Sequence, residues 1–248
     1  MNTHPDIRIF PDLPALFRAA AKEVAAQANA AVAARGRFTV ALSGGSTPKG
    51  MYNLLAGNSS LPWDKIFFFF GDERHVPPDD PESNYRMARE SVLAKAPVPA
   101  KNVFRIPAED PDAANAAQTY EQTLRNFFQT SPEKLPRLDL VLLGMGPDGH
   151  TASLFPQTKA LQEKSRLVVS NWVEKFKTDR ITLTTPVLNN AEAVMFLVSG
   201  PDKAQALKQV LEGEQSAELY PSKLIQPTNG RLIWMVDQAA AAALSKSV

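Results

Sequence analysis

The chain has 248 residues, 44% of them hydrophobic and 21% charged, which is enough apolar material for a sizeable core. A net charge of +1 argues against a nucleic-acid or membrane surface as partner. No cysteine is present, which excludes disulfides, thiol nucleophiles and thiolate metal sites and fits a reducing compartment. The first residues lack the pattern of a signal peptide, and the apolar runs are too short for a membrane span. We therefore expect a cytoplasmic protein.

The first half of the chain alternates helix patterns with buried-strand patterns. An alanine-rich segment at 13–35 has apolar residues at helical spacing, and Gly36 is typical of a helix end. The loop 75–81 is proline-rich, so we expect it to be irregular. The remaining elements predicted here are strand 38–42, helix 48–55, strand 66–70, a helix capped by Ser83 or Asn84 and ending near 95, a short strand at 103–106 and helix 113–129.

The second half of the chain continues the same alternation. Its predicted elements are strands 138–143, 166–170, 180–184 and 192–198, a helix ending near 211, strand 231–236 and a last helix from Asp237. Strands that alternate with helices imply a parallel sheet with right-handed crossovers. No linker or repeat interrupts the chain, so we expect one α/β domain over residues 1–248.

A glycine-rich segment with three hydroxyl side chains follows the strand at 38–42. It consists of Ser43, Gly44, Gly45, Ser46 and Thr47. Glycines let the backbone approach a ligand closely, and the amides at a following helix start bind anions. The spacing matches neither a P-loop nor a dinucleotide motif. The segment predicts a phosphate site, with a plain turn and helix cap as the alternative.

Charged residues follow the next strand, as Asp72, Glu73 and Arg74. Two adjacent side chains of an extended segment point in different directions, so we expect one carboxylate to face a site. Arg74 offers a forked cation for phosphate or carboxylate. A surface cluster of salt bridges is the alternative interpretation.

The third candidate is Asp148-Gly149-His150, directly after the strand at 138–143. A histidine exchanges protons near neutral pH, and a neighbouring carboxylate can hold its tautomer. A tight turn with a surface histidine is the alternative. A metal site is hard to build, because His4 is terminal and His75 lies in the proline-rich loop. We expect no metal.

Two isolated cations complete the set of candidates. Arg180 begins a predicted strand, and Lys203 lies near a helix start, where a cation is mildly unfavourable unless an anion binds there. Chance surface placement is the alternative for both. Together, the strand-end clusters predict acid/base chemistry on a small phosphorylated metabolite.

These motifs resemble the 6-phosphogluconolactonase family along nearly the whole chain. The matching segments are 42–48, 71–74 with 83–85, 144–156, 180–184, 200–204 and 221–240. The resemblance implies a Rossmann-like open, mainly parallel sheet with helices on both faces. It also implies hydrolysis of 6-phospho-D-glucono-1,5-lactone to 6-phosphogluconate, a step of the oxidative pentose phosphate pathway, with a phosphosugar lactone as the small-molecule partner. It suggests a monomer or weak homodimer and requires no cofactor.

The resemblance also implies roles for the candidate residues. His150 would be the general base, oriented or tuned by Asp148 or Asp72. Arg74 would contact either the phosphate or the developing oxyanion. The expected phosphate-binding residues are Ser43, Gly44, Gly45, Ser46, Thr47, Arg180 and Lys203.

Two other functions remain open. Glucosamine-6-phosphate deaminase shares the fold, but its segment after the histidine ends in Phe-Asn-Glu-Pro, and here Phe155 replaces that glutamate. Its Asp-Glu-Tyr is also replaced, by Asp72-Glu73-Arg74. A non-catalytic sugar-phosphate sensor usually carries a DNA-binding module, and no basic helix-turn-helix segment is visible. These departures favour the lactonase.

Overall fold

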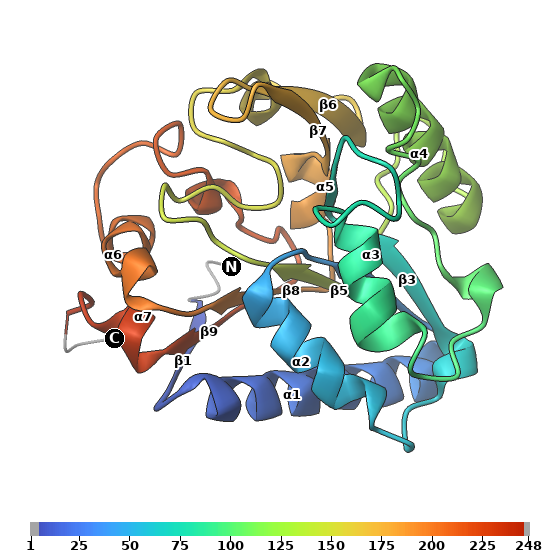
Figure 1. Ribbon diagram of the computed structural model, residues 1–248, viewed down its shortest axis with the longest axis horizontal. Coiled ribbons are helices and arrows are strands. Elements are labelled where there is room, and N and C mark those ends of the chain that lie inside the picture. Colours follow the sequence, from blue (N-terminus) through green and yellow to red (C-terminus); the bar gives the residue numbers. More distant parts are fainter. Residues whose placement is uncertain (1–4, 246–248) are drawn as a thin grey trace.

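The computed structural model describes residues 5–245, and Figure 1 shows their arrangement. His4 and the other residues before position 5, for which the sequence predicts no signal peptide, lie outside the described residues. Six parallel strands form the central sheet in the order β1-β9-β8-β5-β2-β3. They are β1 Asp6–Phe10, β2 Phe38–Leu42, β3 Ile66–Phe70, β5 Leu140–Leu143, β8 Ala193–Val198 and β9 Arg231–Asp237. The predicted open, mainly parallel α/β sheet is confirmed.

Helices lie against the central sheet, with α1 and α2 below the strands in Figure 1 and α5 above them. The helices are α1 Leu13–Arg35, α2 Ser46–Ala56, α3 Asn84–Ala88, α4 Ala113–Phe128, α5 Thr185–Asn189, α6 Ala204–Leu211 and α7 Gln238–Ala241. Local sequence sets the ends of α1. The Asp12 side chain accepts a hydrogen bond from the amide of Ala15 at 2.7 Å, and Gly36 ends the helix with φ of 73°.

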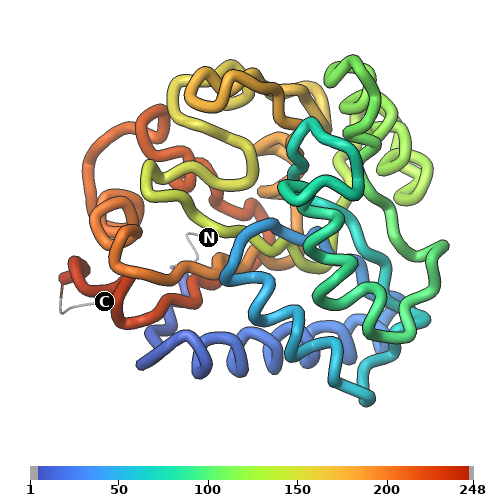
Figure 2. The backbone as a smooth tube through the Cα atoms, viewed as in Figure 1, coloured from blue at the N-terminus to red at the C-terminus, as the bar shows by residue number. Residues whose placement is uncertain are grey.

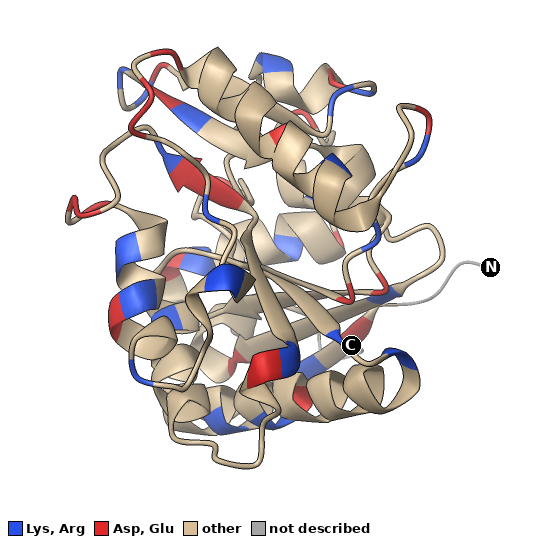
Figure 3. Cartoon of the chain, turned by 90° about the vertical axis from the view of Figure 1, so that its right-hand side faces the viewer, with Lys and Arg blue, Asp and Glu red and all other residues tan. Residues whose placement is uncertain are grey.

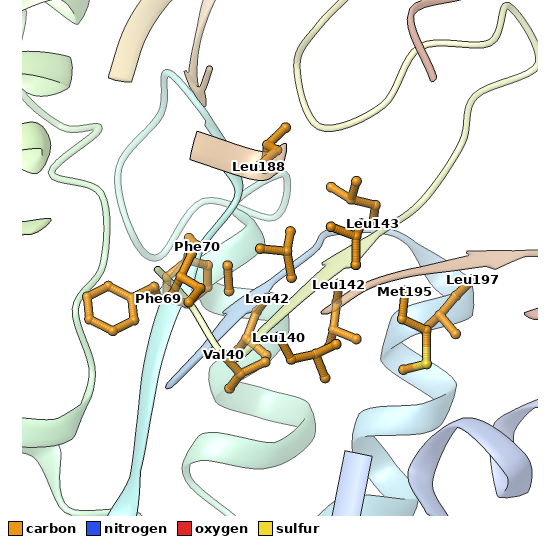
Figure 4. Close-up of a cluster of buried hydrophobic side chains, with 14 of the residues drawn as sticks. Val40, Leu42, Phe69, Phe70, Leu140, Leu142, Leu143, Leu188, Met195 and Leu197 are labelled. Atoms are coloured by element: carbon orange, nitrogen blue, oxygen red, sulfur yellow. The ribbon is translucent and has the colours of Figure 1, made fainter. Parts of the chain in front are cut away.

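The core lies on both faces of the central strands. Every residue of β2, β5 and β8 is buried, which explains why these strands read as continuous apolar runs. Figure 4 shows Val40 and Leu42 of β2 beside Leu140 and Leu142 of β5, with Met195 of β8 farther along. This packing holds the carboxyl ends of the strands in fixed positions.

A second sheet of three antiparallel strands lies above the first in Figure 1. Its order is β4-β7-β6, with β4 Asp72–Arg74, β6 Val168–Val173 and β7 Thr178–Leu183. We expected β6 and β7 from the sequence, but as members of a parallel sheet, and that expectation was wrong. A four-residue turn joins them, and so short a connection permits only antiparallel pairing.

Other predictions differ from the structure in detail. The strand expected at 103–106 is absent from the described residues, where Val103 makes only an isolated bridge to Phe68. The edge strand β1 was not predicted, because its side chains are exposed or only partly buried and give no continuous apolar run. The helix expected at 48–55 begins at Ser46, two residues earlier.

The strand order reverses at β2. From β2 the chain moves to its neighbour β3, and then crosses back to β5 on the other side of β2. Loops that leave β2 and β5 therefore diverge and open a crevice at the carboxyl edge of the sheet, which is the usual ligand position in open α/β folds.

Two segments far apart in sequence lie side by side next to this crevice. Figure 2 traces the loop after β5, in yellow-green, and the segment around 216–222, in red. The amide of Gln157 donates to the carbonyl of Glu218 at 3.1 Å, and the amide of Ser222 donates to Gly149 at 2.9 Å. The later segment therefore braces the loop that carries His150.

Charge is dispersed over the surface. Figure 3 shows Lys and Arg interspersed with Asp and Glu on the side facing the viewer. Between residues 5 and 245, none of the helices combines the length and apolar content needed to cross a membrane.

Candidate active site

One cavity of about 210 Å³ opens at the carboxyl ends of four central strands. Ser43 directly follows β2, Gly144 follows β5 and Ser199 follows β8, while Asp72 comes two positions after the end of β3, at the start of β4. The lining residues are Ser43, Gly44, Gly45, Ser46, Thr47, Pro48, Asp72, Arg74, Asn84, Gly144, Met145, Gly146, His150, Ala152, Leu197, Ser199 and Lys203. The structure thus brings together the candidate clusters that the sequence places at separate strand ends.

The segment after β2 provides backbone donors to the cavity. A Cβ on Gly44 would lie 1.9 Å from the Oδ1 atom of Asn84, so any other residue there would displace the Asn84 side chain from its hydrogen bonds to Asp72. Gly45 has φ of 106°, a conformation that side chains rarely adopt, and it precedes α2. No side chain caps α2, so the amides of its first turn lack acceptors. Amides at such a helix start are able to bind an anion, and the Thr47 hydroxyl lies beside them in the cavity lining.

The two adjacent carboxylates have different surroundings. Asp72 lines the cavity and accepts a hydrogen bond from the hydroxyl of Ser153 at 2.6 Å. Glu73 is buried and accepts hydrogen bonds from the amides of Arg74, Asn84 and Tyr85 at 2.6–2.8 Å. Burial raises the pKa of Glu73, although these amides oppose the shift. Glu73 therefore holds the start of α3, and Asp72 is the carboxylate that faces the cavity.

His150 and Asp148 form a hydrogen-bonded pair at the end of β5. The His150 Nδ1 atom lies 2.5 Å from Asp148 Oδ1, and the His150 amide lies 3.3 Å from the same oxygen. Gly149, with φ of 74°, makes the tight turn between them. Asp148, rather than Asp72, is therefore the carboxylate in contact with the imidazole.

The ionised form of Asp148 is favoured by its neighbours. Burial alone would raise its pKa, but the hydrogen bond from His150, the charge of that ring and Lys175 outweigh burial and lower it well below the ordinary value. The Lys175 Nζ atom lies 3.5 Å from Asp148 Oδ2. In the neutral form of the ring, an ionised Asp148 favours the tautomer with the proton on Nδ1, and Nε2 is then the ring atom able to accept a proton.

The three candidate cations differ in position. Arg74 and Lys203 line the cavity, whereas Arg180 does not. Arg180 lies on β7 directly opposite Arg74 of the neighbouring strand β4. It is buried, and its guanidinium lies 5.1 Å from the ring centre of Phe176. Burial, followed by the charge of Arg74, lowers the pKa of Arg180. Within the described chain its Nε atom has no hydrogen-bond partner.

Two lining residues with polar side chains were missed as site candidates. Ser199 directly follows β8 and lies 2.6 Å from the Thr47 hydroxyl, so the strand-end rule would have found it. Asn84 was expected only as a possible helix cap, but its side chain donates to Asp72. No local sequence signal indicates that contact, which joins segments 12 residues apart. No group of three or more His, Asp or Glu side chains that could hold a metal occurs within residues 5–245.

The strand order and the cavity define an open α/β protein with a cavity at the switch point of its parallel sheet, lined by His150, which is hydrogen-bonded to Asp148. Residues 11–234 match the family described as glucosamine-6-phosphate isomerases/6-phosphogluconolactonase, and the chain belongs to this family. The resemblance inferred from the sequence is thereby confirmed.

Individual relatives agree with this family over nearly their whole lengths. A 6-phosphogluconolactonase of Nostoc sp. is 46% identical over 239 residues, which cover 96% of this chain and 98% of the relative. The human 6-phosphogluconolactonase is 40% identical, covering 96% of this chain and 93% of the relative. The solved structure of 6-phosphogluconolactonase from Trypanosoma cruzi has 30% identity and a TM-score of 0.88, covering 99% of this chain and 98% of that one.

Proposed function

We propose that this chain hydrolyses 6-phospho-D-glucono-1,5-lactone to 6-phosphogluconate, as a step of the pentose phosphate pathway. The observation that carries the proposal is one cavity lined by His150, by the uncapped start of α2 and by Lys203, with Asp148 hydrogen-bonded to the His150 ring. The names of its relatives support the substrate, because proteins at 46% and 40% identity are 6-phosphogluconolactonases. Lactone hydrolysis requires the three elements that such a cavity supplies: a base, an oxyanion site and a phosphate anchor.

His150 is the general base in this proposal. Asp148 holds the proton on Nδ1, and Nε2 takes a proton from water as the water attacks the lactone carbonyl. The same proton then passes to the ring oxygen as the carbon–oxygen bond of the lactone breaks. The lactone is already a reactive ester, so positioning and proton transfer account for the acceleration.

The phosphate anchor lies at the start of α2. The amides of Gly45, Ser46 and Thr47 and the Thr47 hydroxyl donate to phosphate oxygens, and Lys203 adds a positive charge. Ser43 and Gly44 complete the wall of this site. All of these groups belong to one chain, so we infer that a single-domain monomer is sufficient for activity.

Asp72 and Arg74 are the other charged groups in the cavity. Asp72 is fixed by Ser153 and Asn84 and makes no hydrogen bond to His150 among the described residues, so it orients substrate hydroxyls instead. Arg74 stabilises negative charge, with the buried Arg180 next to it on β7. The two adjacent guanidinium groups raise the positive potential at this end of the cavity.

The test is a pair of assays on the purified protein. Freshly generated lactone should disappear far faster than in buffer, and 6-phosphogluconate should form in equal amount. Glucosamine 6-phosphate, the substrate class named by the other half of the family description, should release no ammonia. Lactone decay at the buffer rate would refute the proposal, and ammonia release would assign the chain to the deaminase branch.

A further inference from the structure

The His150 ring is enclosed on several sides by its own loop. Asp148 holds Nδ1, and a Cβ on Gly146 would lie 2.1 Å from both Cε1 and Nδ1, so the backbone of Gly146 touches the ring. The ring of Phe155 stacks on it with centroids 4.1 Å apart and planes at 20°. Within the described chain, no protein group bonds to Nε2.

The loop after His150 folds back to make this stack possible. Ala152 has φ of 47°, in the left-handed region, which reverses the chain direction. The amide of Leu154 then donates to the carbonyl of Thr151 at 2.9 Å, and the Leu154 side chain is fully buried. As a result Phe155, five positions after His150, lies over the imidazole and is only 6% exposed.

The turn between β6 and β7 supports the stack from outside. Phe176 meets Phe155 edge-on, with ring centres 5.7 Å apart and planes at 78°, which is a favourable aromatic geometry. Arg180 lies over the Phe176 ring, and Lys175 reaches Asp148. The β6–β7 turn therefore contacts Phe155, which stacks on His150, and also contacts Asp148 directly.

We propose that Phe155 is a positioning residue, which fixes the plane of the His150 ring so that Nε2 faces the cavity, and that Phe176 holds Phe155 in place. A hydrogen bond at Nδ1 fixes one ring atom and leaves the tilt of the ring free. A parallel aromatic ring at van der Waals distance restricts that tilt. This inference rests on the proposed function, in which His150 is the general base. A general base that is displaced from the reacting water transfers protons much more slowly, so the orientation of the ring affects kcat.

The first test is Phe155→Leu, compared with Phe155→Tyr. Leucine keeps an apolar side chain but removes the ring, so kcat should fall by about 10- to 100-fold while KM changes by less than about threefold. Tyrosine keeps the ring and should restore most of kcat. A leucine variant with the kcat of the wild type overturns the proposal, and so does an equal loss of kcat in the tyrosine variant.

The second test uses the surface residue Phe176, whose replacement does not endanger folding because it is 45% exposed. Phe176→Leu should lower kcat by about two- to tenfold, the range that one aromatic pair is worth. Trp172→Leu is the matched control, since Trp172 lies on the same hairpin, is 51% exposed and forms no aromatic pair in the described chain. Equal effects of the two variants overturn the role of Phe176.

A third measurement tests the stack without any substrate. The chain has three histidines, so the ring protons of His150 can be assigned by NMR with a His150→Asn variant. They should be shifted upfield by the Phe155 ring in the wild type, and the shift should disappear in Phe155→Leu and persist in Trp172→Leu. No upfield shift in the wild type overturns the inference. A shifted signal in a protein without lactonase activity leaves the stack intact and refutes the proposed function instead.

Discussion

The two sheets contribute different things to the same cavity. The parallel sheet brings backbone amides, hydroxyls and His150 to its carboxyl edge, through loops that leave β2, β5 and β8. The antiparallel sheet contributes Asp72 and Arg74 from β4 and supports the histidine loop through the β6–β7 turn. In the proposed mechanism, anion binding therefore depends on the common α/β architecture, whereas the positioning of His150 depends on the added antiparallel sheet.

The two sheets also differ in how deeply their residues are buried. All residues of β5 and β8 are buried, but β6 has partly exposed residues and an exposed Trp172. Substitutions near the parallel sheet should therefore change binding or chemistry at a rigid site. Substitutions in the antiparallel sheet should change how well that site is held.

The largest expected effect is on chemistry at the parallel sheet. His150→Ala should lower kcat by about 10²–10⁴-fold with a smaller change in KM, because a general base contributes roughly that factor. Steady-state lactone hydrolysis, corrected for spontaneous decay, measures it. His75→Ala is the matched control, since His75 bonds to the carbonyl of Asp110 in another loop and should leave kcat unchanged. Full turnover by His150→Ala would remove the histidine from the mechanism.

The antiparallel sheet should show its largest effect in stability. Glu73→Ala leaves three backbone amides without acceptors, so the free energy of unfolding should fall by about 2–4 kcal/mol, even though the cost of burying the carboxylate is removed. Urea denaturation measures the change. The exposed neighbour Glu82 is the control, and Glu82→Ala should shift stability by less than about 0.5 kcal/mol. Equal shifts in both variants would contradict the anchoring role of Glu73.

Substitutions of Lys203 and Arg180 compare a cation that lines the cavity with one on the antiparallel sheet that does not. Lys203→Ala should raise KM by about 10- to 100-fold, because a charge-assisted contact to phosphate is worth roughly 1.5–3 kcal/mol. Arg180→Leu should raise KM less, since Arg180 is behind Arg74 and does not line the cavity. Kinetics with both variants, each checked by circular dichroism, measure the difference. An unchanged KM in Lys203→Ala would move the phosphate site elsewhere.

The smallest expected effect concerns pH. The folded protein lowers the pKa of Asp148, so its ionised form contributes stability at neutral pH, and that contribution is lost as pH falls below the ordinary value near 4. The gap in unfolding free energy between the wild type and Asp148→Asn should therefore be larger at pH 7 than at pH 3. Urea denaturation at both values measures it. A gap that does not depend on pH would mean that the carboxylate has no charge-dependent partner.

Sequence patterns predicted the parallel sheet because each of its inner strands is buried on both faces and reads as an apolar run. The position of the cavity followed, because the carboxyl ends of such strands are where open α/β sheets form a crevice. The edge strand β1 gave no such run, since its residues are exposed or only partly buried. Local sequence patterns therefore predict fully buried strands well and strands at the edge of the sheet poorly.

The pairing of strands in the antiparallel sheet could not be predicted from local sequence patterns. Pairing of β4 with β7 joins residues 72–74 to 180–182, and no short-range signal specifies that register. The same limit applies to His150, because the sequence offered Asp148 and Asp72 equally and only the fold shows that Asp72 is bound to Ser153. The position of Arg180 behind Arg74 also depends on this pairing.

Gly71 connects the two sheets through its backbone. Its amide donates to the carbonyl of Leu42 in β2 at 2.9 Å, and its carbonyl accepts from the amide of Leu183 in β7 at 2.8 Å. The two sheets thus share one continuous path of peptide hydrogen bonds, and neither can separate at this point without breaking a bond on Gly71. Hydrogen exchange at the Leu183 amide consequently reports the opening of this joint, and its protection should match that of the amides within β2 if the sheets unfold as one cooperative unit.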